Sequence, residues 1–123
     1  MLTATGKGVQ IYACQNAAWV FQAPEARLLD AAGKAIGAHG AGPVWTLKDG
    51  SSVKGQVAAK SDAPGAGDIP WLLLKAVDGS GKFSNLRFIR RSDTHGGAAP
   101  AGRCEAGRTQ KVPYTATYTF YAP

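Results

Sequence analysis

The sequence contains little of what catalytic and metal sites usually require. Its 123 residues include two histidines and two cysteines, without a Cys-x-x-Cys pair, a Gly-x-Ser-x-Gly turn or a phosphate-binding glycine loop that leads into a helix. A transition-metal site usually needs three or four nitrogen, sulfur or carboxylate ligands, and a paired-carboxylate hydrolase needs two acids held close together. Most of the acidic residues lie in turns. We therefore recognise no catalytic set, and the sequence leaves any cofactor unknown.

A membrane-spanning run and a leader are also missing from the sequence. The apolar run Trp71–Leu74 is far too short to cross a bilayer. The first residues, Met1–Ala4, lack the basic region and the apolar stretch of a signal peptide. If the protein is extracytoplasmic, we expect that its leader has been removed.

The two cysteines, Cys14 and Cys104, predict one disulfide. Their spacing matches no metal motif, so pairing with each other is their simplest use. A disulfide persists outside the reducing cytosol, and the sequence therefore predicts a secreted or periplasmic protein. The alternative is a cytosolic protein with two free thiols.

Turn residues are abundant, and they separate short alternating segments. Sixteen glycines and seven prolines are present, and Asp49-Gly50 stands between the alternating segments 44–47 and 53–57, which is a strong hairpin signal. Near the end of the chain, Tyr114, Ala116, Tyr118 and Phe120 share one face of a strand. We predict a single all-β domain over residues 1–123, an antiparallel sandwich or barrel of about eight or nine short strands with one disulfide and little or no helix.

Four segments carry more specific expectations. A strand over 19–21 is expected to stop at Pro24. Residues 58–68 are expected to form a surface loop. Residues 69–76, apolar throughout their centre, predict a strand covered on both faces. Residues 92–111 predict a long excursion that Cys104 ties down.

The positive charge is uneven along the chain. The net charge is +6, and residues 82–111 contain seven basic residues against Asp93 and Glu105. Such a region favours an anionic glycan or a cell-surface polymer as partner, and an ordinary solvated basic surface is the alternative. Nucleic acid is disfavoured, because proteins that bind it carry denser basic clusters with interleaved aromatic residues.

Five residues are candidates for a ligand-binding site. His39 and Trp45 lie in a stretch of small residues that lets the backbone approach a ligand, although a histidine bonded to a carbonyl and a core tryptophan are the alternatives. Arg90 and Arg91 form the only adjacent basic pair, and His95 lies in a glycine-rich stretch. For a metal, His39 is the only candidate with support, and a site would need both histidines, His39 and His95, together with an aspartate or glutamate.

Several motifs resemble those of a family of secreted bacterial and fungal proteins, the domain of unknown function DUF3455. The motifs are Gly8-Val9-Gln10-Ile11-Tyr12-x-Cys14, Gly37-x-His39-x-Ala41-Gly42-Pro43-x-Trp45, Ile69-Pro70-Trp71-Leu72-Leu73-Leu74 and Val112-Pro113-Tyr114-x-Ala116-x-Tyr118-x-Phe120-Tyr121. The resemblance implies a signal peptide and secretion, and it makes the paired cysteines and the histidine motif family features. It implies no activity, and no shared role for His95.

Three hypotheses for the function follow. The first is a non-enzymatic, extracytoplasmic module that binds a ligand or a surface. The second is a metal-binding protein or metal-dependent enzyme that uses His39. The third is a structural protein that self-assembles through exposed strand edges or an aromatic patch.

Overall fold

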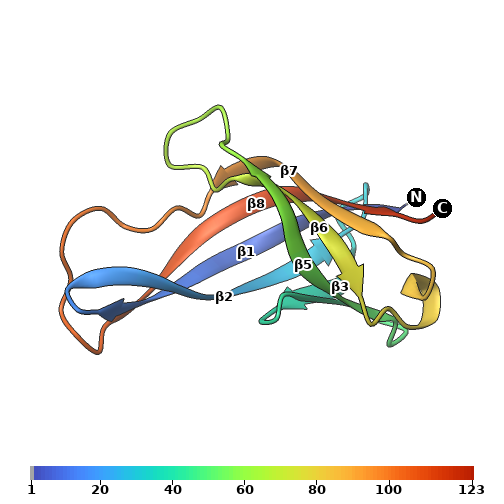
Figure 1. Ribbon diagram of the computed structural model, residues 1–123, viewed down its shortest axis with the longest axis horizontal. Coiled ribbons are helices and arrows are strands. Elements are labelled where there is room, and N and C mark those ends of the chain that lie inside the picture. Colours follow the sequence, from blue (N-terminus) through green and yellow to red (C-terminus); the bar gives the residue numbers. More distant parts are fainter. Residues whose placement is uncertain (1) are drawn as a thin grey trace.

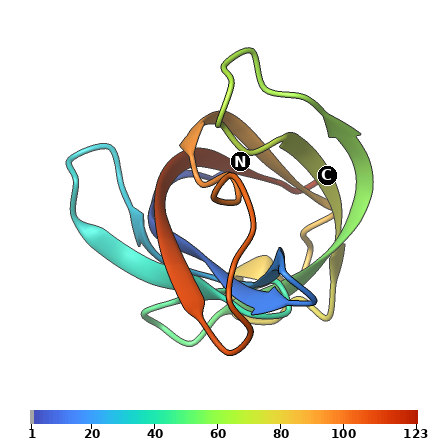
Figure 2. The ribbon, with the colours of Figure 1, turned by 90° about the vertical axis from the view of Figure 1, so that its left-hand side faces the viewer.

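Eight antiparallel strands follow one another around a closed barrel, and the last strand pairs with the first (Figure 1). The structure, a computed structural model, describes residues 2–123. The strands are β1 (Leu2–Gln15), β2 (Ala18–Leu29), β3 (Ala35–Gly40), β4 (Val44–Leu47), β5 (Ser52–Ser61), β6 (Trp71–Val77), β7 (Phe88–Gly96) and β8 (Thr109–Tyr121). Seen along the barrel, they form a ring around the interior (Figure 2).

The predicted fold class and disulfide are confirmed. The chain is an all-β barrel, and its helical part in the described residues is the single 3₁₀ turn η1 (Gly81–Phe83). Cys14 and Cys104 form a disulfide that spans a sequence separation of 90 residues. The alternative with two free thiols is therefore wrong. No helix in residues 2–123 is both long enough and apolar enough to cross a membrane.

Two expected strand boundaries are wrong. Strand β2 runs through Pro24, where it pairs with β1 but not with β3, whose pairing begins at Ala26. A proline is tolerated there because, at this residue, the strand is paired on one side only. The expected loop over 58–68 is also shorter, since β5 continues to Ser61 by pairing with Trp71 of β6.

The expectation of a strand covered on both faces is wrong as well. In β6, Leu74 is 2% exposed but Leu73, on the opposite face, is 37% exposed. A barrel wall has an inner and an outer surface, and successive residues of a strand point to opposite sides of it. The expected excursion over 92–111 is reduced to residues 97–108, because β7 continues to Gly96 and β8 begins at Thr109.

Aromatic rings form a continuous column inside the barrel. The ring of Phe83 stacks on Phe120 with 5.0 Å between centroids, Phe120 meets Trp45 edge-on at 6.1 Å, and Trp45 stacks on His39 at 4.4 Å. Gly55 makes room for this column, because a Cβ at that position would lie 2.8 Å from the Trp45 ring. The column thus connects the two ends of the barrel.

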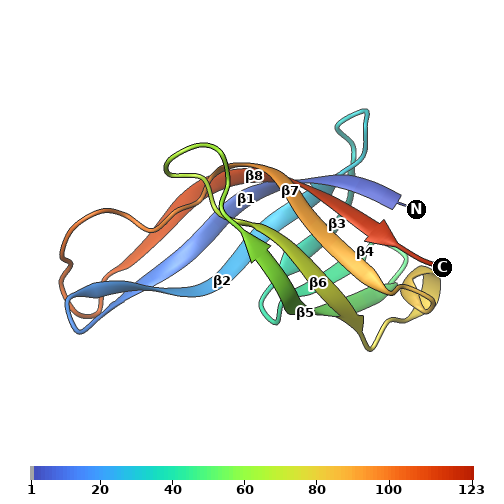
Figure 3. The same ribbon diagram turned by 45° about the horizontal axis from the view of Figure 1, so that its top comes forward.

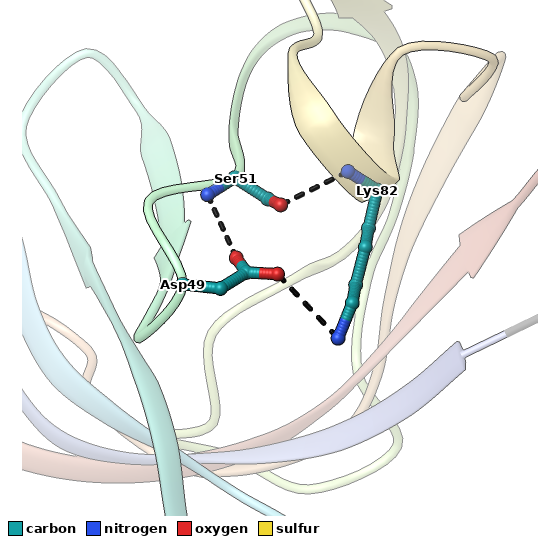
Figure 4. Close-up of polar contacts among 3 residues, drawn as sticks. All are labelled: Asp49, Ser51 and Lys82. Carbon is teal, nitrogen blue, oxygen red and sulfur yellow. Dashed lines mark hydrogen bonds and ion pairs between the residues drawn. The ribbon is translucent and has the colours of Figure 1, made fainter.

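One end of the barrel, hereafter the plugged end, is closed by η1 and the β4–β5 turn. Figure 4 shows its polar contacts: Asp49 Oδ1 accepts the Ser51 N–H at 2.9 Å, and Ser51 Oγ accepts the Lys82 N–H at 2.9 Å. Asp49 also forms an ion pair with Lys82 at 3.4 Å. Phe83, which is 2% exposed, fills the space beneath them. The start of β1 and the end of β8 lie at this end (Figures 1 and 3).

The other end, hereafter the pocket end, carries the β1–β2 hairpin and the irregular segment 97–108. Figures 1 and 3 show both projecting away from η1. The disulfide fixes the segment to β1, and the Cys14 N–H donates to the Arg108 carbonyl at 2.8 Å. The Tyr12 hydroxyl donates to the Gly97 carbonyl at 2.5 Å. In the closed barrel each strand is paired with a neighbour on both sides. Within residues 2–123, no strand therefore has an edge that is unpaired along its whole length and could join another copy, as the self-assembly hypothesis would need.

Candidate functional site

A pocket of about 240 Å³ enters the barrel between β2, the β3–β4 turn and β5. Every strand contributes at least one lining residue, which is a consequence of closure. Its apolar wall consists of Phe21, Pro24, Pro43, Val57, Leu72 and Leu74. At the rim, Phe21 is 49% and Val57 is 55% exposed, so the mouth of the pocket is itself apolar.

The His39–Trp45 pair forms one side of the interior. The two residues are register partners on β3 and β4, and their rings stack with an interplanar angle of 14°. His39 Nδ1 lies 2.9 Å from the Val44 carbonyl oxygen, which can only accept a hydrogen bond, so Nδ1 carries the proton. In the neutral ring, Nε2 is therefore left as a hydrogen-bond acceptor.

His39 is uncharged at neutral pH. Burial lowers its pKa from the ordinary value of 6.5 to about 4; the hydrogen bond to Val44 opposes this shift, and the positive charge of Arg91 adds to it. The pocket therefore holds a neutral imidazole next to a guanidinium.

Arg91 brings the single formal charge into the pocket lining. Its register partners, Leu72 and Tyr118, line the pocket from the neighbouring strands. Its Nε and Nη2 donate to the Pro70 carbonyl oxygen at 3.0 and 2.8 Å, which anchors the half-buried guanidinium. The two ion pairs within residues 2–123, Lys82–Asp49 and Arg108–Glu105, do not involve it. Arg91 thus has a backbone anchor but no carboxylate partner.

The tyrosines near Arg91 do not neutralise its charge. The hydroxyls of Tyr114 and Tyr118 are hydrogen-bonded to each other at 2.9 Å. Burial raises the pKa of Tyr114 and raises that of Tyr118 well above 10.0, although the Arg91 charge opposes both shifts. Both phenols are therefore neutral at physiological pH, and no carboxylate lies among the described residues that line the pocket.

Two residues of the pocket lining hold buried polar atoms without a hydrogen-bonding partner. They are the carbonyl oxygen of the Gln10 side chain, an acceptor, and the indole Nε1 of Trp45, a donor. Gln10 is 3% and Trp45 is 1% exposed. Such a group costs about 1–3 kcal/mol when it is left unpaired in the interior. A ligand that satisfies either atom would recover part of this cost.

The structure brings three of the five sequence candidates together and leaves two outside. His39, Trp45 and Arg91 all line the pocket. Arg90 is exposed on the outer face of β7, where its guanidinium lies 5.7 Å from the centroid of the Trp71 ring. His95 is exposed further along β7, beside Thr115 of β8.

The sequence analysis did not select Gln10 or Tyr118 for the site. Gln10 is a polar residue on the inner face of β1, one of the alternate positions that also include Tyr12 and Cys14. The available signal was this polar residue on a face that carries an aromatic residue and a disulfide cysteine. Tyr118 was predicted as a member of a strand face and of a family motif, but not of the site. Nothing local indicated that it would meet Arg91.

The metal hypothesis finds no ready ligand set in the described chain. Within residues 2–123, no three side chains of histidine, cysteine, aspartate or glutamate are grouped so that they could hold a metal ion. His39 has Nδ1 engaged by a carbonyl, and its aromatic neighbours are Trp45 and Tyr118.

Fold and pocket together define the class of protein: a disulfide-bonded, closed antiparallel β-barrel with an interior pocket to which all eight strands contribute. The chain belongs to the family described as "Protein of unknown function (DUF3455)", whose model matches residues 1–122. This confirms the family that the motifs indicated. Searches of curated proteins and of solved structures found no match.

Proposed function

We propose that the protein is an extracytoplasmic, non-enzymatic binding module that holds a small ligand in the barrel pocket. The observation that carries this proposal is the pair of unpartnered buried atoms, Gln10 Oε1 and Trp45 Nε1, in residues that line a pocket. Buried polar groups are normally hydrogen-bonded, and binding sites combine apolar walls with a few polar groups that fix the orientation of the ligand. The pocket has both features.

The disulfide supports the extracytoplasmic part of the proposal. The bond between Cys14 and Cys104 holds segment 97–108 against β1 at the pocket end, and structural disulfides persist in oxidising compartments. Thiol titration of protein isolated from its native host tests this directly. Two reactive thiols in the denatured protein would contradict an extracytoplasmic location.

The basic residues of segment 82–111 divide between the pocket and the surface. Of the seven basic residues in 82–111, Lys82 and Arg108 are paired with carboxylates, and Arg91 lies in the pocket lining. An anionic glycan or cell-surface polymer therefore stays a prediction for the remaining exposed charges. Its binding would weaken strongly between low and high salt.

The indole resonance of Trp45 provides the test of the proposed function. In a ¹H–¹⁵N correlation spectrum, each of the three tryptophans gives its own indole N–H signal. A panel of small neutral and charged compounds at millimolar concentration should include members that shift the Trp45 signal and leave those of Trp19 and Trp71 in place. If no compound moves the Trp45 signal, or if all three signals move together, the proposal is wrong.

A further inference from the structure

We infer that the ligand is a small organic monoanion with an apolar body, whose carboxylate binds Arg91 while the body packs against the apolar wall. This inference rests on the proposed function and names the chemical class of its ligand. It stands on the anchoring of Arg91, the composition of the pocket wall and the size of the pocket, which are argued in turn.

The guanidinium of Arg91, which has no carboxylate partner, favours an anion as the ligand. A half-buried guanidinium without a carboxylate partner retains attraction that an incoming anion can use. Two of its N–H groups donate to the Pro70 carbonyl, so the guanidinium is held in place before a ligand arrives. Pro70 leaves three of the five N–H donors unused, and the Tyr118 hydroxyl competes for one of them. A carboxylate needs two such donors for a bidentate contact.

One positive charge matches one negative charge. His39, Tyr12, Tyr114 and Tyr118 are the titratable groups whose pKa values respond to the Arg91 charge, and all are neutral at physiological pH. A dianion such as phosphate would retain an uncompensated charge among apolar side chains, which is costly. The pocket therefore favours a monovalent carboxylate.

The apolar wall and the volume of the pocket determine the chemistry and size of the rest of the ligand. The apolar side chains of Phe21, Pro43, Val57 and Leu72 line the same pocket as Arg91. The volume of about 240 Å³ equals that of about eight water molecules at liquid density. This is room for one ring with its acid group, rather than for a segment of polymer. A sugar carries more hydroxyl groups than the few polar atoms of the pocket can satisfy, so part of its hydration would be lost against the apolar wall.

Benzoate is the probe for this inference, and benzamide is its neutral counterpart of nearly the same shape. Titrated into the wild-type protein, benzoate should shift the Trp45 indole signal, and benzamide should bind at least about tenfold more weakly because it lacks the charge. Glucuronate, a monoanion of polar body, should leave the signal in place over the same concentration range.

Two neighbouring arginines provide a matched pair of variants. Arg91→Gln should weaken benzoate binding by about tenfold or more, whereas Arg90→Gln, which removes the same charge from the outer face, should change it less than about twofold, because exposed charges are screened by salt and solvent. If Arg91→Gln fails to fold, Arg91→Lys retains the charge. It should keep a preference for benzoate over benzamide.

Each other outcome overturns the inference in a distinguishable way. Equal binding of benzamide and benzoate would show that the ligand needs no negative charge, which contradicts the inference but leaves the proposed function standing. Binding of glucuronate with no response to benzoate would show that the body of the ligand is a sugar and not an apolar group. Equal weakening by Arg90→Gln and Arg91→Gln would show only a surface charge effect. If no probe moves the Trp45 signal, both the inference and the proposed function fail.

Discussion

The two ends of the barrel treat their polar groups in opposite ways. At the plugged end, the carboxylate of Asp49 and the hydroxyl of Ser51 are both occupied by partners from the adjoining turn and from η1. At the pocket end, Gln10 and Trp45 each bury a polar atom without a partner, and Arg91 has no counterion. An aromatic column joins the two ends, so the contrast arises within one continuous interior.

This contrast separates groups that stabilise the fold from groups that lower its stability. A satisfied hydrogen bond contributes about 0.5–1.5 kcal/mol to stability, whereas a buried group that loses its partner costs about 1–3 kcal/mol. The plugged end therefore has the composition of a structural closure. The pocket end retains unfavourable groups that a ligand can satisfy, and such local departures from good packing are typical of functional sites.

The largest expected effect comes from the disulfide at the pocket end. Replacing both Cys14 and Cys104 by alanine should lower the free energy of unfolding by about 4–5 kcal/mol on the chain-entropy model, because the bond closes a long loop. Chemical denaturation of the double variant measures this loss. A loss below about 1 kcal/mol would show that the pocket end does not depend on its covalent tie.

The next effect compares a phenylalanine at each end. Phe83→Ala should cost about 3–5 kcal/mol, because this buried ring stacks on Phe120 and fills the plugged end. Phe21→Ala should cost well under half of that, since the ring is 49% exposed at the pocket rim. Denaturant midpoints of the two variants give the comparison. Similar losses would mean that Phe21 at the pocket rim contributes as much to stability as Phe83 at the plugged end.

A third comparison uses the pH windows of the two ends. His39 has a folded pKa of about 4 and an ordinary value of 6.5, so between these values the unfolded chain binds a proton that the folded chain does not. Stability should therefore fall as the pH is lowered from 6.5 to 4, by up to about 3 kcal/mol from this residue. Unfolding measured across this range should show a slope that His39→Gln flattens.

The plugged end should respond only at lower pH. The Ser51 backbone N–H, followed by the other contacts of Ser51 and Lys82, holds the pKa of Asp49 below its ordinary value of 3.8. The stability that this carboxylate contributes is present above pH 3.8 and is lost as the pH falls through its lower folded pKa. Asp49→Asn should consequently leave the slope between pH 6.5 and 4 unchanged. If Asp49→Asn flattened this slope, the pH dependence between 6.5 and 4 would arise at the plugged end and not at His39.

The smallest expected effect is a change in stability that has opposite signs for one variant at each end. Gln10→Met should leave stability unchanged or raise it by about 1 kcal/mol, because it removes an unpartnered buried oxygen from the pocket end at similar volume. Ser51→Ala should lower stability by about 1 kcal/mol, because it leaves the Lys82 N–H without its acceptor. Thermal midpoints are sufficient for this comparison. Two losses of the same size would contradict the distinction between the ends.

Local patterns in the sequence predicted much of the fold but less of the site. The alternation of Tyr114, Ala116, Tyr118 and Phe120 correctly gave one buried face of β8, and Asp49-Gly50 correctly marked the β4–β5 hairpin. Among the site residues, His39 and Trp45 were selected from their own stretch of chain and lie in contact. Arg91 was selected only as half of a basic pair. Alternation along the strand places Arg90 and Arg91 on opposite faces, but nothing local showed that the face of Arg91 would be the inner one.

The sequence by itself determined the all-β class, most of the turns between the strands and the two cysteines that pair. These depend on interactions between residues close in the chain, on side-chain alternation, or on cysteine count. Only the tertiary structure decided that β8 pairs back with β1, and that this closure turns Gln10, Trp45 and Arg91 toward one pocket. The reason is that alternation fixes which residues of a strand share a face. The face that becomes the interior depends on pairings between distant segments.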